Sequence, residues 1–269
     1  MRVGKKIIFS LISIIVALIA IFSVYIYVSV PIPSNSQNKI VQISFDDVYL
    51  CIKDLKDTLR YTSVFQQPFF KSLKELHDVY GAVFSLYVYE KADNFVITEV
   101  PDKFRNEFIE NSEWLKFGYH AIEPRFDKKE QSLEFERSFL NVRKSILHWA
   151  GKSSLAPCLR LHYYFADDSM IAILKKYKVY HLLGADDEGR ISYNLNRLQS
   201  DSLYARRAYI YDSIYYHKTD IRIERMECFP LELLNYQNKD TITLFSHEWA
   251  MNGHRNILNR IKLRQSIKW

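Results

Sequence analysis

The chain has 269 residues, of which 48% are hydrophobic and 15% aromatic, and its formal net charge is +6. This composition excludes a disordered or low-complexity chain and suits one folded domain of barrel size. The three cysteines lack CxxC spacing, which excludes a zinc ribbon and a disulfide framework, and no basic stripe is interleaved with aromatic residues, so we expect no nucleic-acid partner.

The first 30 residues have the pattern of a membrane anchor. Basic residues at positions 2, 5 and 6 precede a run of 24 residues, from Ile7 to Val30, without a charged side chain. A helix of that length crosses a hydrocarbon core of about 30 Å, and the preceding positive charges favour a cytoplasmic N-terminus. We predict a single-pass transmembrane signal anchor at 1–30, with a cleaved signal peptide as the alternative.

A polar linker with two prolines is predicted at 31–38, so that the folded domain spans 39–269 on the extracytoplasmic side of the cell membrane. Within this domain, β-branched apolar runs alternate with stretches of helical period, which predicts an α/β fold. Strands are predicted at 39–43, 82–89, 117–120, 157–164, 179–183 and 240–247. Helices are predicted at 49–59, 68–80, 104–114, 128–150, 170–177, 229–234 and 249–267. An antiparallel hairpin is predicted at 205–227, as an insertion flanking the cleft.

Two predicted helices carry residues that define an end or a face. Gly81 is expected to end the helix at 68–80, because glycine adopts the left-handed conformation found after a helix. The helix at 128–150 is expected to bury an apolar face opposite its charges. That face comprises Leu133, Phe135, Phe139, Val142, Ile146 and Trp149.

Two adjacent carboxylates, Asp46 and Asp47, lie where the first strand gives way to a helix, in the sequence Ser44-Phe45-Asp46-Asp47-Val48. In α/β folds, ligands bind at the edge of the sheet where the strands end. Of two neighbouring carboxylates, one can bind a metal while the other acts as a base. The alternative is a turn with a helix N-cap, a role that aspartate fills well.

The stretch 44–48 resembles the first motif of the polysaccharide deacetylases, which are metal-dependent carbohydrate esterases with a distorted (β/α) barrel. The resemblance implies that Asp46 is the general base and that Asp47 is a metal ligand. For the whole chain it implies an α/β fold with a distorted (β/α) barrel of the polysaccharide deacetylase type, preceded by the transmembrane helix, and a polysaccharide substrate.

The second and third motifs of that family are matched in part. His120, at a predicted strand end, is similar to the first metal-binding histidine of the second motif, but Pro124 stands where the family has another histidine. Arg160 matches the third-motif arginine that orients the catalytic aspartate, and His162 stands in place of a family proline. The resemblance implies that His162 replaces the missing ligand, with Glu123 or a histidine from elsewhere as the alternative.

Together with Asp47 and His120, His162 would provide one carboxylate and two imidazoles. This set suits Zn²⁺ and leaves a position open for water.

The last strand contains Leu244-x-x-His247, which resembles the closing Leu-x-His motif of the family with one extra residue. The resemblance implies that His247 is the general acid that protonates the leaving amine, or else a further metal ligand. Glu248 either fixes the tautomer of His247 or starts the next helix with a favourable charge.

Structural roles remain as alternatives at these positions. Arg160 and His162 could form an ion-pair cluster with Asp46 or Asp167, and Asp167 is also expected to cap the helix at 170–177. The acidic pair at 186–187 is interpreted as a turn rather than a second metal site.

Three functions are compatible with this sequence. We expect a membrane-anchored, extracytoplasmic, metal-dependent hydrolase that removes acetyl groups from a cell-envelope or extracellular polysaccharide. The second is a catalytically degenerate domain that binds glycan without turnover, which the proline at position 124 motivates. The third is a membrane-tethered assembly component of envelope polysaccharide synthesis, with the hairpin at 205–227 as a protein contact. Metal-dependent acetate release and stable partner binding distinguish the three.

Overall fold

The computed structural model describes residues 2–29, 40–227, 229, 231–252 and 256–268. Helix α1 (Arg2–Ser29) precedes the folded domain, and the predicted linker at 31–38 lies outside the described residues. Among the described residues, no helix combines the length and the apolar character needed to cross a membrane. The transmembrane anchor at 1–30 stays a prediction.

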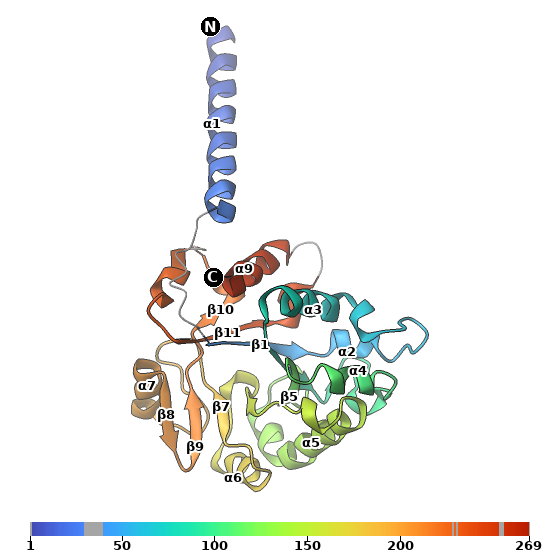
Figure 1. The fold of residues 1–269 in the computed structure, drawn as a ribbon. Coiled ribbons are helices and arrows are strands. Elements are labelled where there is room, and N and C mark those ends of the chain that lie inside the picture. The colour runs from blue at the N-terminus through green and yellow to red at the C-terminus, as the bar shows by residue number, and fades with distance from the viewer. Residues whose placement is uncertain (1, 30–39, 228, 230, 253–255, 269) are drawn as a thin grey trace.

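The folded domain is built around a parallel sheet. Its strands follow the spatial order β10-β11-β1-β2-β5, and each neighbouring pair is parallel. These strands are β1 (Ile40–Val48), β2 (Phe84–Tyr89), β5 (Leu115–Ala121), β10 (Ile221–Arg222) and β11 (Thr241–His247). Strand β1 lies in the middle of the sheet, between β11 and β2 (Figure 1), so residues near its end have neighbours on both sides.

A second sheet continues from β5. Its order is β6-β7-β9-β8, in which β6, β7 and β9 are parallel and β8 is antiparallel to β9. These strands are β6 (Cys158–Leu159), β7 (His181–Leu183), β8 (Ala208–Tyr211) and β9 (Ile214–His217). A parallel bridge between Phe117 and Leu155 links β5 to the segment before β6. Beyond β9, the backbone N–H of Asp220 donates to the carbonyl oxygen of Thr243 in β11.

The two sheets therefore follow one another round the domain, and the predicted α/β fold with parallel strands is confirmed. The distorted (β/α) barrel of the polysaccharide deacetylase type stays a prediction. The hairpin predicted at 205–227 is present as β8 and β9, but its interpretation as an insertion is wrong for β9, because β9 pairs in parallel with β7. A small hairpin of β3 (Lys91–Ala92) and β4 (Phe95–Val96) lies outside both sheets.

Helices connect the strands and pack around the sheets (Figure 1). They are α2 (Leu50–Asp54), α3 (Pro68–Tyr80), α4 (Arg105–Glu110), α5 (Lys128–Trp149), α6 (Asp168–Lys176), α7 (Arg197–Arg206), α8 (Glu248–Met251) and α9 (Ile257–Lys268). Helix α3 has the predicted bounds. The side chain of Gln67 accepts hydrogen bonds from the first turn of α3, and Gly81 ends the helix with a φ of 69°.

Other predicted helices differ from the structure. The helix expected at 49–59 ends at residue 54, and the one expected at 249–267 is divided into α8 and α9. On α5, five residues of the predicted apolar face are buried, whereas Leu133 is 72% exposed. Leu133 is exposed because, at about 100° per residue, it lies on the side of α5 opposite Gln131 and Phe135, which are both buried.

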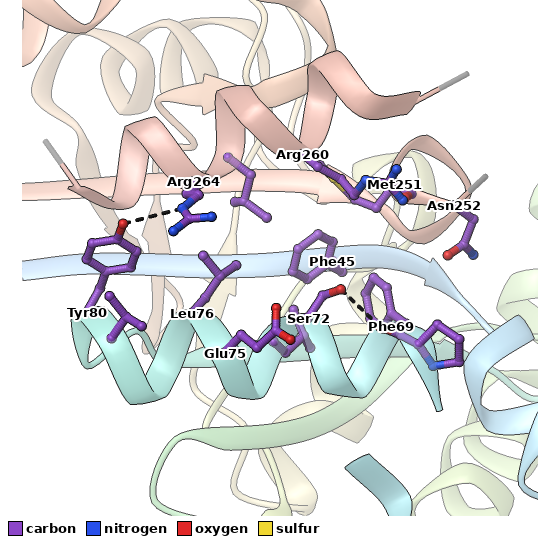
Figure 2. A pocket seen from close by; sticks show the side chains of 14 residues that line it. Phe45, Phe69, Ser72, Glu75, Leu76, Tyr80, Met251, Asn252, Arg260 and Arg264 are labelled. Atoms are coloured by element: carbon purple, nitrogen blue, oxygen red, sulfur yellow. Dashed lines mark hydrogen bonds between the residues drawn. The ribbon is translucent and has the colours of Figure 1, made fainter. Parts of the chain in front are cut away.

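A cavity of about 550 Å³ lies between α3 and α9, with Phe45 of β1 at its floor (Figure 2). Leu76 and Met251 line it together with Arg260 and Arg264. This cavity contains none of the predicted site residues. The next residue of β1 along the chain faces a different cavity, because successive side chains of a strand point to opposite sides.

Candidate active site

The predicted site residues come together at the carboxyl ends of the parallel strands. Asp46 and Asp47 lie near the end of β1, and Asp46 is the register partner of His247 at the end of β11. His120 lies near the end of β5, and the segment 160–162 directly follows β6. Because parallel strands end at one edge, these distant segments supply one cavity, of about 290 Å³.

Asp47, His120 and His162 could hold a metal ion, because each offers one ligand atom and these atoms lie within 4.8 Å of one another. Oδ1 of Asp47 lies 3.3 Å from Nε2 of His120 and 3.6 Å from Nδ1 of His162. One carboxylate and two imidazoles form a donor set typical of catalytic zinc sites. The alternative ligand Glu123 instead pairs with Arg125.

The second ring nitrogen of each histidine faces a backbone carbonyl. Nδ1 of His120 lies 2.7 Å from the carbonyl oxygen of Arg160, and Nε2 of His162 lies 3.3 Å from that of Pro124. A carbonyl oxygen only accepts, so each of these nitrogens carries the proton. Nε2 of His120 and Nδ1 of His162 then face Asp47, and each can act as a metal ligand once it has lost its proton. Metal-binding histidines are oriented in this way, so the donor set fits a divalent metal such as Zn²⁺.

Burial and charge set the protonation of this cluster. Burial alone would raise the pKa of Asp47, but the hydrogen bond and charge of His120 hold that pKa well below its usual value. Burial and the charge of His120 lower the pKa of His162 to about 3. Burial would also lower the pKa of His120, but Asp47 and Asp46 raise it above its usual value. A neutral His162 beside an ionised Asp47 is the protonation state that metal binding requires.

Two further donors hold Asp47. The hydroxyl of Tyr89 donates to Oδ1, and Nε1 of Trp249 donates to Oδ2 at 3.0 Å. Asp47 has a φ of 57°, in the left-handed region that residues other than glycine rarely adopt. Such a conformation persists where the surrounding contacts fix it. Tyr89 and Trp249 therefore belong to the site, although the sequence analysis did not select either.

Asp46 is held by Arg160, which is 1% exposed. Nη1 of Arg160 lies 3.1 Å from Oδ1 of Asp46. The same nitrogen donates to Oγ of Ser44, and Nη2 donates to Oγ1 of Thr219. Burial would lower the pKa of Arg160, but the charge of Asp46 raises it above its usual value. A charged guanidinium thus fixes the carboxylate of Asp46 at the cavity wall, as the motif implied.

Glu224 orients His247. Nδ1 of His247 lies 2.5 Å from Oε1 of Glu224. Burial would raise the pKa of Glu224, but hydrogen bonds from His247, Ser246 and Arg222 lower it to about 2. The ionised carboxylate accepts the Nδ1 proton, so Nε2 of His247 faces the cavity, 3.9 Å from Oδ2 of Asp47.

Two predicted alternatives are wrong. Glu248 does start α8, but it does not orient His247: its buried carboxylate accepts the backbone N–H groups of residues 49–51 at 2.6–2.8 Å and so caps the start of α2. Asp167 does not pair with Arg160, because its side chain caps α6. The prediction that it caps a helix is confirmed.

The sequence contained a signal for one of the missed residues and none for another. Tyr89 ends β2, so the rule that selected the other strand-end residues applied to it as well. Glu224 lies in a 3-10 turn after β10 and reaches His247 only through the pairing of β10 with β11. No spacing along the chain indicates that contact.

Two exposed aromatic side chains line the cavity beside the histidines. Tyr163 is 54% exposed, and its ring centre lies 4.5 Å from that of His162. Trp249 is 51% exposed and stacks on His247, with ring centres 5.1 Å apart. Both rings expose apolar area at the mouth of a polar cavity.

No protein-family model matches the chain, and no curated protein matches it. Among solved structures, a family 4 carbohydrate esterase from Streptomyces lividans matches with a TM-score of 0.41 and 10% identity, over 86% of this chain and 90% of that chain. The chitin deacetylase from Colletotrichum lindemuthianum matches with a TM-score of 0.40 and 12% identity, over 87% and 83%. A CE4 family pseudoenzyme from Bacillus anthracis matches with a TM-score of 0.42 and 8% identity, over 86% and 60%.

Proposed function

We propose that this chain is a metal-dependent hydrolase that removes acetyl groups from an N-acetylated polysaccharide. The observation that carries the proposal is the arrangement of the cavity. The candidate ligands Asp47, His120 and His162 lie next to Asp46, which Arg160 holds, and His247 lies on the neighbouring strand with Nε2 facing the same space. A base, an acid and a metal-binding set around one cavity are the parts that amide hydrolysis needs.

A divalent metal bound by these three residues would supply Lewis acidity to water and to the acetamide carbonyl. The carboxylate of Asp46 is placed to accept the proton of the attacking water, and the guanidinium of Arg160 holds this carboxylate in place. The backbone carbonyls of Arg160 and Pro124 fix the rings of the two histidine ligands.

His247 is placed to donate a proton from Nε2 to the leaving amine. Water adds to the acyl carbon, the C–N bond breaks, and acetate and the free amine are the products. Glu224 binds the Nδ1 proton throughout, so the ring exchanges its catalytic proton only at Nε2. The exposed faces of Tyr163 and Trp249 would pack against sugar rings on either side of the reacting group.

We also propose that α1 anchors the chain in the cell membrane, with the folded domain on the extracytoplasmic side. The uncharged run at 7–30 and the basic residues before it support this location. A substrate in the cell envelope or outside the cell would then lie on the same side as the domain. A protease-protection assay on membrane vesicles tests the orientation, and digestion of the domain from the cytoplasmic side would overturn it.

The activity is tested by acetate release from N-acetylated oligosaccharides with the full-length chain and added Zn²⁺. We expect release that a chelator abolishes and that falls at least about 100-fold in His120→Ala and His247→Ala. His148→Ala, an exposed position on α5, is the matched control and should keep full activity. No release by the metal-loaded wild type, or full release by His120→Ala, would overturn the proposal.

A second function, glycan binding without turnover, is favoured by one observation. Both carboxylate oxygens of Asp47 already accept hydrogen bonds, from Tyr89 and Trp249, so the carboxylate is satisfied by protein groups alone. Binding of oligosaccharide with neither metal uptake nor acetate release would support this function against the first.

A further inference from the structure

Three arginines line the candidate active-site cavity: Arg190, Arg222 and Arg225. Arg190 follows β7, Arg222 ends β10, and Arg225 follows β10. The motifs did not predict any of them. Arginine side chains in a ligand cavity recognise carboxylate and phosphate groups, because the planar guanidinium can donate two parallel hydrogen bonds to them.

The acidic partners of these arginines do not line the cavity. Asp187 lies 2.6 Å from Nη1 of Arg225 and 3.7 Å from Nη1 of Arg190. Glu224 binds Nε of Arg222 at 2.7 Å. Each carboxylate therefore holds a guanidinium from one side and leaves another side facing the cavity.

Each guanidinium has N–H groups beyond those that its described contacts use. Arginine has five N–H donors in a fixed planar fork. Arg225 contacts its aspartate partners through Nη1. Arg222 contacts Glu224 through Nε and His247 through Nη2. The guanidinium of Arg190 is held over the ring of Tyr164, 4.7 Å from its centre. A prearranged fork with donors to spare matches a carboxylate or phosphate group.

The charge of the cavity points the same way. Among its lining residues, the two carboxylates Asp46 and Asp47 have cations of their own: Arg160 pairs with Asp46, and Asp47 belongs to the proposed metal set. The carboxylates that balance the three lining arginines, Glu224, Asp186 and Asp187, do not themselves line the cavity, so the arginines are the charged groups that a ligand meets there.

We infer that the cavity binds an acidic glycan, in which a carboxylate or phosphate group on a sugar next to the acetylated one contacts Arg190 and Arg225. Arg190 also lies near Tyr163, 6.0 Å from the centre of its exposed ring. A sugar packed on Tyr163 would therefore bring its acidic group within reach of Arg190. The inference names the substrate class of the proposed hydrolase and rests on that proposal for its catalytic part only, because the charge preference is a property of binding.

The test compares two tetrasaccharides on the full-length, detergent-solubilised protein by isothermal titration calorimetry. One is a hyaluronan tetrasaccharide, which alternates N-acetylglucosamine with glucuronic acid, and the other is neutral chitotetraose. We expect the acidic ligand to bind at least about 10-fold more tightly at low salt, and the difference to shrink as salt is raised. Inorganic phosphate as a competitor distinguishes the two anions: strong competition at millimolar concentration indicates a phosphate-bearing glycan, and weak competition a carboxylate.

Arg190→Gln and Arg225→Gln should each lower the affinity for the acidic tetrasaccharide by about 10-fold and leave the affinity for chitotetraose unchanged. Arg60→Gln is the matched control, because Arg60 is 53% exposed and pairs with an aspartate but lies outside the cavity, whereas the similarly exposed Arg225 pairs with aspartates and lines the cavity. It should change neither affinity. Unchanged circular dichroism spectra and melting temperatures show that the variants are folded.

Equal affinity for the two tetrasaccharides, binding of neither, or an equal loss for both in the arginine variants would overturn the inference. These outcomes are separate from failure of the proposed hydrolase. A charge preference that depends on Arg190 without acetate release would sustain this inference and contradict the enzyme, whereas acetate release with equal affinities would do the reverse.

Discussion

The carbonyl oxygen of Pro124 lies 3.3 Å from Nε2 of His162. The family motif that the sequence resembles has a metal-binding histidine where this chain has Pro124. Proline lacks an N–H group but keeps its carbonyl oxygen, which can accept the proton on Nε2. His162 thereby presents Nδ1 to Asp47, and the ligand set can be completed from the next strand end.

Metal content tests this relationship. The full-length chain, purified without a metal-binding tag, should hold about one equivalent of zinc. Asp47→Ala and His162→Ala should each weaken zinc binding by more than about 100-fold, because a direct ligand contributes more than the 10–100-fold typical of an outer partner. Pro124→Ala is the control, since the backbone carbonyl remains, and it should retain the metal. A full equivalent in His162→Ala, measured by mass spectrometry of the elements, would show that another residue is the third ligand.

The contact of Glu224 with His247 predicts an effect on turnover. Glu224→Gln should lower kcat by roughly 100-fold with KM within about twofold, because the amide no longer selects the tautomer that has the Nδ1 proton. Ser246→Ala removes the hydrogen bond to the other carboxylate oxygen and leaves His247 in place, so it should cost less than about fivefold. Steady-state acetate release measures both. A loss in Ser246→Ala as large as in Glu224→Gln would indicate a general structural effect instead.

Substitution of Glu248 should have a large effect on the stability of the fold, because this residue caps α2 and does not take part in the proposed reaction. Its carboxylate accepts three backbone N–H groups at the start of α2, and it is fully buried. Glu248→Gln should lower the free energy of unfolding by about 1–3 kcal/mol, because the amide nitrogen is buried against donors and cannot accept. Urea denaturation followed by circular dichroism gives the value. Glu99→Gln, at an exposed surface ion pair, should leave the free energy of unfolding close to that of wild type. An equal loss in that variant would show that the buried cap at Glu248 has no special role.

The environment of Glu90 should make the free energy of unfolding depend on pH in the acidic range. Burial would raise its pKa, but hydrogen bonds from Arg137 and Asn141 lower that pKa below the usual value of 4.5. A depressed carboxyl pKa contributes stability that is fully present above the unfolded value and is lost as the pH falls through the folded value. The urea concentration at the midpoint of unfolding should therefore decrease as the pH is lowered below about 4.5. Glu90→Gln should lower the free energy of unfolding at pH 7 by about 1 kcal/mol and make that free energy depend less on pH in the acidic range, which flattens this acidic slope.

The control for that measurement is Glu136→Gln. Like Glu90, Glu136 has a basic partner, in this case Lys176, and accepts a further hydrogen bond, but its side chain is 39% exposed. Its substitution should leave both the stability at pH 7 and the acidic slope close to those of wild type. A slope in Glu90→Gln as steep as that of wild type would assign the acid sensitivity to other carboxylates.

Local sequence determined the elements that have strong local signals. Helix α3 was predicted with both ends, because proline in its first turn and a glycine in the left-handed conformation after it act without help from distant residues. The strand ends at Asp46, His120 and His247 were predicted for a similar reason, since apolar runs that stop at a polar residue mark where a parallel strand leaves the sheet.

Predictions failed where a distant partner decides the structure. Leu133 is an error of another kind, because it was included in the apolar face of α5 although the helical period places it opposite Phe135, and it is exposed. The helix after β1 was predicted too long, because its start is fixed by Glu248, far away in the sequence, and its end by the packing of the next segment.

The sequence by itself determined the α/β class, the order of the strand ends, and the residue types at the candidate site. Only the tertiary structure decided which of these residues meet. It brought His162 to Asp47 and Glu224 to His247, turned Glu248 away from His247, and placed arginines around the cavity. The physical reason is that periodicity and turn residues act over a few positions, whereas contacts at the edge of a parallel sheet depend on strand order and register, which are set by the packing of the whole domain.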